Sequence, residues 1–144
     1  MKTVDKAVAA VVRTHDGRRD LLVFTHPQAG VQLPKGTIEA DESIALATLR
    51  ELEEESGLRL STPSHYVGAW NRVLNGGAIH PWHVSLLDAP AGLPEQWDHV
   101  ATGSPEEEGL IFAFHWLPID ADLPARLHPL FADVIRMILD HFDR

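Results

Sequence analysis

The chain has 144 residues, of which 44% are hydrophobic and 23% are charged, and its formal net charge is -9. This length and composition fit one folded domain spanning residues 1–144, and they exclude a disordered or fibrous chain. The acidic charge argues against nucleic acid as the main partner, because phosphate backbones are bound by clustered Lys and Arg. The sequence has no cysteine, which excludes disulfides and thiolate metal sites and fits a cytoplasmic location.

Two apolar, β-branched runs open the chain. Residues 6–14 and 21–27 flank an Asp-Gly turn, a pattern that predicts a β-hairpin. The first run is too short, and too soon followed by charge, to span a membrane, and no signal-peptide cleavage pattern follows it. We therefore expect no membrane partner. The segment VQLPKG at residues 31–36 predicts a short strand that stops at its proline and glycine.

A helix is predicted next. It begins at Asp41 or Ser43, either of which can cap a helix N-terminus, and ends at Gly57, a residue type typical of helix C-termini. At about 100° per residue, one narrow face, which we expect to pack on the sheet, is formed by Ala45, Leu49, Leu52 and Ser56.

The second half of the chain predicts more strands and one further helix. Residues 65–75 and 79–88 flank a Gly-Gly pair and predict a second hairpin. Residues 89–109, rich in Pro, Gly and charge, predict a long surface loop, and residues 110–119 predict a buried strand with Trp116 in the core. A final helix is predicted from the apolar spacing of Leu127, Leu130, Phe131, Val134, Ile135, Ile138, Leu139 and Phe142. The mixed order of strands and helices predicts an α/β sandwich with a central mixed β-sheet.

The last turns of the first helix carry four glutamates. Acids at a helix C-terminus are unfavourable by roughly 0.3–1 kcal/mol each, because the macrodipole places negative charge there. On a helical wheel Glu51, Glu54 and Glu55 share an arc of about 100° away from the packing face, whereas Glu53 points to the other flank. Clustered carboxylates raise one another's pKa unless a cation joins them. A hard divalent cation such as Mg²⁺, which prefers oxygen ligands, best explains three converging carboxylates.

The spacing of these residues carries a resemblance to a known family. Gly36, Glu42 and the run RELEEESGL at residues 50–58 stand at the fixed positions of the Nudix box. The chain therefore resembles the Nudix hydrolases, which act on a nucleoside diphosphate linked to another moiety. The order of predicted elements also resembles the α/β/α sandwich of that family. Asp41 departs from the pattern, because glycine is common at that position.

The resemblance implies a metal site. By similarity, Glu51, Glu54 and Glu55 would hold one or more Mg²⁺ or Mn²⁺ ions, with help from the backbone carbonyl of Lys35. Such ions lower the pKa of a bound water, so that it attacks phosphorus, and neutralise the charge of the diphosphate. The wheel geometry selects the same three glutamates without the resemblance.

The resemblance also implies supporting roles around that site. Arg50 would pair with Glu42, tying the box loop to the helix, and would orient the metal-binding carboxylates as part of the catalytic group. Gly36 would let the loop backbone approach the metal, and Gly57 would end the helix.

Further residues are candidates for contacts with substrate or water. The proton acceptor of the attacking water could come from the loop carboxylates Glu106, Glu107 or Glu108, which could equally be solvated. The side chains of Lys35 and Arg72 could bind phosphate or stay on the surface. Several aromatic and histidine side chains could either stack on a base of the substrate or pack within the fold: Tyr66, Trp70, His80, Trp82, His83, Trp97 and His99.

The predicted function is metal-dependent hydrolysis of a diphosphate linkage in a small phosphorylated nucleotide derivative. The LPKGTIE entry to the box resembles enzymes that act on dinucleoside (diadenosine) polyphosphates or diphosphoinositol polyphosphates, which makes these the favoured substrate class. Nucleoside triphosphates, nucleotide sugars and ADP-ribose are alternatives. A non-catalytic nucleotide-sensing module is an alternative of another class. The chain could be a monomer or a homodimer.

Overall fold

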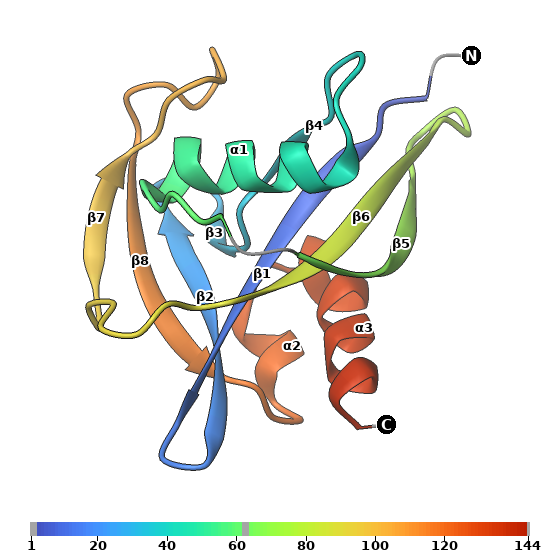
Figure 1. Ribbon diagram of the computed structural model, residues 1–144. Coiled ribbons are helices and arrows are strands. Elements are labelled where there is room, and N and C mark those ends of the chain that lie inside the picture. The colour runs from blue at the N-terminus through green and yellow to red at the C-terminus, as the bar shows by residue number, and fades with distance from the viewer. Residues whose placement is uncertain (1–2, 62–63, 144) are drawn as a thin grey trace.

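The computed structural model describes residues 3–61 and 64–143 (Figure 1). The strands are β1 (Lys6–His15), β2 (Arg18–His26), β3 (Gly30–Gln32), β4 (Lys35–Thr37), β5 (His65–Val73), β6 (Ile79–Asp88), β7 (Trp97–Val100) and β8 (Ile111–Pro118). The helices are α1 (Ile44–Ser56), α2 (Leu123–Arg126) and α3 (Ala132–Phe142), with the 3₁₀ turn η1 (Pro129–Phe131) before α3. None of the helices in this described part is long and apolar enough to cross a membrane.

All strands of the described part belong to one mixed sheet. Its order is β5-β6-β1-β2-β8-β7, with β3 paired to β2 and β4 paired to β1. The β1–β6 pair is parallel, and the other recorded pairs are antiparallel. Both predicted hairpins are confirmed as β1–β2 and β5–β6.

Helices cover the two faces of this sheet, and β1 supplies both faces with apolar side chains. Val8 packs with Ile135 of α3 on one face, and Ala9 packs with Leu52 of α1 on the other. This alternation follows from the two-residue period of a strand. The arrangement, with α1 on one side and α2 and α3 on the other (Figure 1), confirms the predicted α/β sandwich.

The VQLPKG segment forms two strands rather than one. β3 pairs with β2, and β4 pairs with β1, so the chain changes partner between them. Leu33 is fully buried at this step, and Pro34 has no N–H with which to continue a ladder. This change of partner strand places Lys35 and Gly36 on β4, next to α1.

Residues 89–109 are not a continuous loop, because β7 lies within them. Trp97 is paired with Phe114 of β8 and stacks on its ring, with centroids 5.3 Å apart. Four residues between Pro-rich segments are too few to show a strand pattern, and only the pairing with β8 reveals one. Trp116, which was predicted to lie in the core, packs against it as a half-buried side chain, with the Arg13 guanidinium 4.3 Å above its ring.

The C-terminal helix is shorter than predicted. Leu127 and His128 are extended, as is favoured before Pro129, and η1 then precedes α3, which begins only at Ala132. The apolar stripe still covers the sheet, since Phe131, Val134 and Ile138 are fully buried.

The buried face of α1 is rotated from the predicted one. Ala45 is exposed, and the buried set is Ala47, Thr48, Glu51, Leu52, Glu55 and Ser56. The rotation arises because α1 packs beside β4 as well as over β1. Two of the three predicted metal-binding glutamates therefore lie inside the protein rather than on an open face.

Both ends of α1 are capped. Ser43 accepts a hydrogen bond from Leu46 N–H at 3.1 Å, and Gly57, at φ +80°, donates its N–H to Glu53 O at 2.9 Å. Two further bonds come from the β7 region: Thr102 N–H donates to Glu54 O at 3.1 Å, and Trp97 Nε1 donates to Ser56 O at 2.9 Å. The backbone carbonyls at the acidic end of the helix are thus bonded by donors that are 40 or more residues away in the sequence.

We predict that Trp97→Phe lowers the free energy of unfolding by about 1 kcal/mol, because the bond to Ser56 O is lost while ring stacking is kept. Urea denaturation measures this loss. Trp116→Phe is the matched control, because its Nε1 donates to Pro94 O in an exposed setting and should cost less. Equal losses in the two variants would contradict the capping role.

Candidate active site

Arg50 joins three carboxylates to the end of β4. Its Nε and Nη2 donate to the two oxygens of Glu42 at 2.7 and 2.9 Å, and Nη1 donates to Glu51 at 2.8 Å. Nη1 also lies 3.4 Å from both oxygens of Glu54, and Nη2 donates to Thr37 O at 2.9 Å. The bonds from Arg50 lower the pKa of Glu42 and raise that of the guanidinium itself. The pair between Glu42 and Arg50 that the box implies is present.

Two of the box carboxylates are buried. Glu55 is 2% exposed and Glu51 is 7% exposed. Lys35 N–H donates to Glu55 Oε1 at 2.9 Å. Burial raises the pKa of both carboxyls, and the negative charge of Glu107 raises the pKa of Glu55 further. Glu53 lies on the other flank, as predicted, and pairs with the exposed Arg59.

Two glycines make room for two of these carboxylates. Gly36 of β4 lies against the Glu51 carboxylate, and Gly103, in the loop after β7, lies against the Glu54 carboxylate. A Cβ at either glycine would overlap the carboxyl group. Gly36 is therefore required by the packing of Glu51, a reason that differs from the close approach to metal that the resemblance implies.

The backbone conformation at Asp41 explains why an aspartate can stand where the box pattern commonly has glycine. Its φ is +65°, in the left-handed region that glycine enters without steric cost and that Asp tolerates better than most residues. The turn before α1 therefore keeps the backbone shape that glycine would give at this position.

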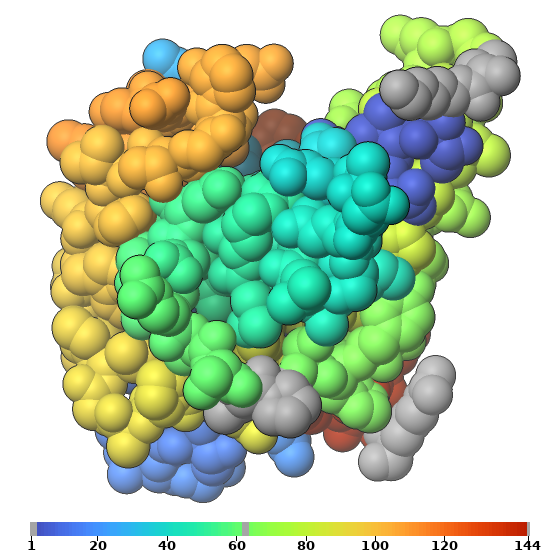
Figure 2. Space-filling view, turned by 45° about the horizontal axis from the view of Figure 1, so that its top comes forward, coloured from blue at the N-terminus to red at the C-terminus, as the bar shows by residue number. Residues whose placement is uncertain are grey.

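A cavity of about 490 Å³ opens between β4 and the loop that follows β7. Figure 2 shows a recess between this loop, in orange, and the cyan segment before α1.

Lys6 lines this cavity, and its Nζ donates to Thr37 Oγ1 at 2.8 Å. The pKa of Lys6 is lowered, chiefly by burial and to a smaller extent by the positive charge of Lys35. The titratable side chains that line the cavity are Lys6, His26, Lys35, Glu39, Glu51, Glu106 and Glu107.

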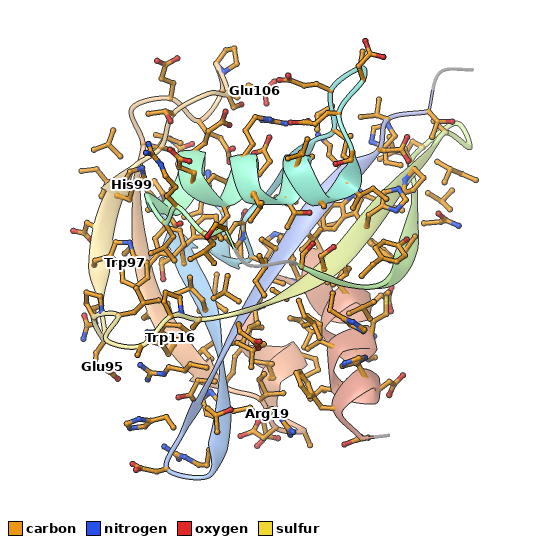
Figure 3. All side chains as sticks on the ribbon, viewed as in Figure 1. Arg19, Glu95, Trp97, His99, Glu106 and Trp116 are labelled. Atoms are coloured by element: carbon orange, nitrogen blue, oxygen red, sulfur yellow. The ribbon has the colours of Figure 1, made fainter. Side chains whose placement is uncertain are left out.

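The three loop glutamates are not equivalent. Glu106 and Glu107 line the cavity, whereas Glu108 does not. Figure 3 shows Glu106 on the loop above α1. Glu107 faces the box: its charge raises the pKa of both buried glutamates, and its carboxylate lies 3.9 Å from His26 Nε2. Glu107 therefore lies near His26 and close enough to the buried box carboxyls for its charge to act on both.

Sequence reasoning missed Lys6, His26 and Gly103. Lys6 begins an apolar strand and His26 ends another, so neither stands in a recognisable motif. They reach the cavity because β4 pairs with β1 and β3 pairs with β2. Gly103 follows a strand that the sequence did not reveal.

The two cations predicted to contact substrate lie near Trp82. The Lys35 ammonium is 5.3 Å and the Arg72 guanidinium 6.0 Å from the Trp82 ring. Lys35 also lines the cavity, whereas Arg72, on β5, lies outside its lining. Trp82 is 1% exposed, and its Nε1 has no hydrogen-bond partner within residues 3–61 and 64–143.

Other aromatic and histidine candidates have structural contacts. Trp97 and His99 lie on β7 beside the end of α1 (Figure 3), where a Cβ at Gly57 would be 2.8 Å from His99 Nδ1. Tyr66 bonds His83 Nδ1 at 3.0 Å, and His83 Nε2 bonds Asp5 at 2.9 Å. These contacts account for four of the side chains without a substrate.

Comparisons with known proteins identify the family. The family model described as NUDIX domain matches residues 4–137. The chain therefore belongs to the NUDIX family, which confirms the resemblance carried by the box. The predicted class of enzyme, a Nudix hydrolase, agrees with the relatives found.

One curated relative and two solved structures are among the matches. The CTP pyrophosphohydrolase of Escherichia coli (strain K12) is 36% identical over 91 residues, which cover 58% of this chain and 64% of that protein. The match thus spans less than two thirds of that relative. The C. elegans Ap4A hydrolase has a TM-score of 0.65 at 14% identity, covering 98% of this chain and 99% of that one. The MutT protein of Methanosarcina mazei Go1 has a TM-score of 0.65 at 19% identity, covering 99% and 96%. Both structures support the fold.

We predict that Arg50→Ala lowers the free energy of unfolding by about 3 kcal/mol, because it leaves half-buried and buried carboxylates without their cation. Chemical denaturation measures the loss. Arg59→Ala removes an exposed pair with Glu53 on the same helix and should cost less than about 1 kcal/mol. A loss for Arg50→Ala as small as that of Arg59→Ala would show that Arg50 does not hold the cluster together.

We also predict a pH dependence that arises from Glu55. Its folded pKa is raised above 4.5 by burial, so the folded protein binds this proton more tightly than the unfolded chain. Stability of the metal-free protein should therefore fall as pH rises above the ordinary carboxyl pKa, until the folded pKa is passed. Glu55→Gln should flatten this slope in thermal unfolding followed from about pH 5 to 8, and Glu53→Gln should not. An unchanged slope in Glu55→Gln would assign the pH dependence to other groups.

Proposed function

We propose that residues 1–144 act as a divalent-metal-dependent hydrolase that cleaves a diphosphate linkage in a small nucleotide derivative. The observation that carries this proposal is that Glu51 lines a cavity that also holds two lysines and shares Arg50 Nη1 with Glu54. Glu55 accepts a hydrogen bond from the backbone of Lys35, a residue of the cavity lining. Carboxylates suit a hard cation and lysines suit phosphate, so one cavity offers both kinds of contact.

The donor set fits Mg²⁺, with Mn²⁺ as a second possibility. Glu51, Glu54 and Glu55 would hold the ion, together with the backbone carbonyl of Lys35. Two of these carboxylates share Arg50 Nη1 as a donor, and no three acidic or imidazole groups of the described chain are already placed to hold an ion. Ligation therefore requires carboxylates to turn from Arg50 toward the cavity. When bound, the ion supplies an acidified water and neutralises phosphate charge.

The residues of the chain would perform the remaining steps. Lys6 and Lys35 would orient the phosphates at the cavity wall, and Arg72 would contact a part of the substrate that extends beyond the cavity. Glu107 would accept the proton of the attacking water, held in place by His26. Arg50 would keep two carboxylates within reach of the cavity without contacting substrate.

The substrate class that we favour is a nucleoside triphosphate. The relative named CTP pyrophosphohydrolase is 36% identical to this chain over 91 residues, whereas the Ap4A hydrolase likeness, at 14% identity, supports the fold alone. Dinucleoside or diphosphoinositol polyphosphates are the second candidate, because the LPKGTIE segment resembles enzymes of that kind. Both classes contain the diphosphate linkage that the site suits.

Product analysis tests this proposal. The purified protein is incubated with Mg²⁺ or Mn²⁺ and nucleoside triphosphates, diadenosine polyphosphates, diphosphoinositol polyphosphates, ADP-ribose or nucleotide sugars, and the products are separated by chromatography. A nucleoside triphosphate should give a monophosphate and inorganic diphosphate. A pair of mononucleotides from a dinucleoside polyphosphate would favour the second class. Binding without hydrolysis in every case would favour a nucleotide-sensing module.

We predict that Glu54→Gln lowers kcat by about 100-fold or more, because the amide keeps the shape of the side chain and removes its charge. The fold should be kept, as measured by thermal unfolding. Glu53→Gln is the matched control on the outer flank of the same turn and should retain activity. Full activity in Glu54→Gln would remove Glu54 from the site.

A further inference from the structure

Gly103 lies outside the Nudix box and contacts one of its glutamates. It follows β7 in the loop that leads to β8, and its φ is +88°. Its backbone is so close to Glu54 that a Cβ would overlap the carboxyl carbon and both oxygens. Gly103 also lines the 490 Å³ cavity.

The loop around Gly103 is fixed to α1 and to itself. Thr102 donates to Glu54 O through N–H at 3.1 Å and through Oγ1 at 3.4 Å. Ala101 N–H donates to Leu110 O at 2.8 Å, and Gly109 N–H donates to Ala101 O at 3.0 Å. The base of the loop is therefore closed, and one end of it is bonded to the residue whose side chain Gly103 contacts.

The Glu54 carboxylate thus has neighbours on two sides. Arg50 Nη1 lies 3.4 Å from each of its oxygens, and the Gly103 backbone lies against the same group. Glu51 has an equivalent arrangement between Arg50 and Gly36. Each of these two carboxylates is confined by the same arginine and by a glycine of its own, one from β4 and one from the loop after β7.

We infer that Gly103 is a positioning residue that confines the Glu54 carboxylate beside the cavity. The inference rests on the proposed function, in which Glu54 holds a divalent ion. A Cβ at position 103 would fill the space that the Glu54 carboxylate occupies at the cavity wall, so the carboxylate could not turn from Arg50 toward the cavity on that side. Because that carboxylate is the end of a flexible side chain, its displacement would cost the fold little and would cost the ion a ligand.

The chain offers a matched control for the strained backbone. Gly109, in the same loop, also has a φ of +88°, and a Cβ there would meet nothing within 4 Å. Gly103→Ala and Gly109→Ala should therefore lower the metal-free unfolding temperature by similar amounts. Mn²⁺ affinity, measured by electron paramagnetic resonance of the free ion, should fall by about 10-fold to 100-fold in Gly103→Ala only. Gly103→Asn, which tolerates the left-handed backbone better, should lose the same affinity with a smaller drop in unfolding temperature.

A double-mutant cycle identifies Glu54 as the cause. In a Glu54→Ala background, Gly103→Ala should produce no further loss of Mn²⁺ affinity, because the obstructed carboxylate is already absent. Three results would each overturn the inference and leave the proposed function standing. The first is unchanged Mn²⁺ affinity in Gly103→Ala and Gly103→Asn, and the second is an equal loss of affinity in Gly109→Ala. The third is a full further loss of affinity when Gly103→Ala is added to Glu54→Ala. A wild-type chain that binds no Mn²⁺ would overturn both the inference and the proposed function.

Discussion

The guanidinium of Arg50 is the interaction on which the rest of the site depends. One side chain bonds Glu42 before the helix, Glu51 and Glu54 within it, and the backbone of Thr37 at the end of β4. A planar fork of five donors can make these contacts together, and a lysine ammonium cannot. Without this cation, three neighbouring carboxylates would repel one another in a region that water only partly reaches.

The helix that carries these carboxylates is stabilised from outside itself. Its acidic last turn opposes the macrodipole, and its buried carboxyls have raised pKa values. Donors from β7 and the next loop satisfy its terminal carbonyls, and backbone from β4 and that loop packs against Glu51 and Glu54. Local helix stability is thus sacrificed at the site and compensated by tertiary contacts, as is typical of functional positions.

The same loop brings two kinds of group to the cavity. Gly103 lies against the box helix, and four residues later Glu107 faces the buried carboxyls and His26. The position of this acid relative to the box is therefore fixed by the bonds that join the loop to α1. Since Lys6 and Lys35 also line the cavity, it holds both cationic and anionic groups, which suits phosphate groups accompanied by a divalent ion.

The sequence by itself determined the family, the sandwich of helices on a mixed sheet, both hairpins, the limits of α1 and the pair of Glu42 with Arg50. These follow from local rules: turn residues, caps and a motif of fixed spacing. Only the tertiary structure decided which face of α1 is buried, the division of residues 31–36 between two strands, the presence of β7, and the places of Lys6, His26 and Gly103. Each depends on pairing between segments distant in the chain, and no local pattern encodes which strand a short segment will join or which side chain it will then meet.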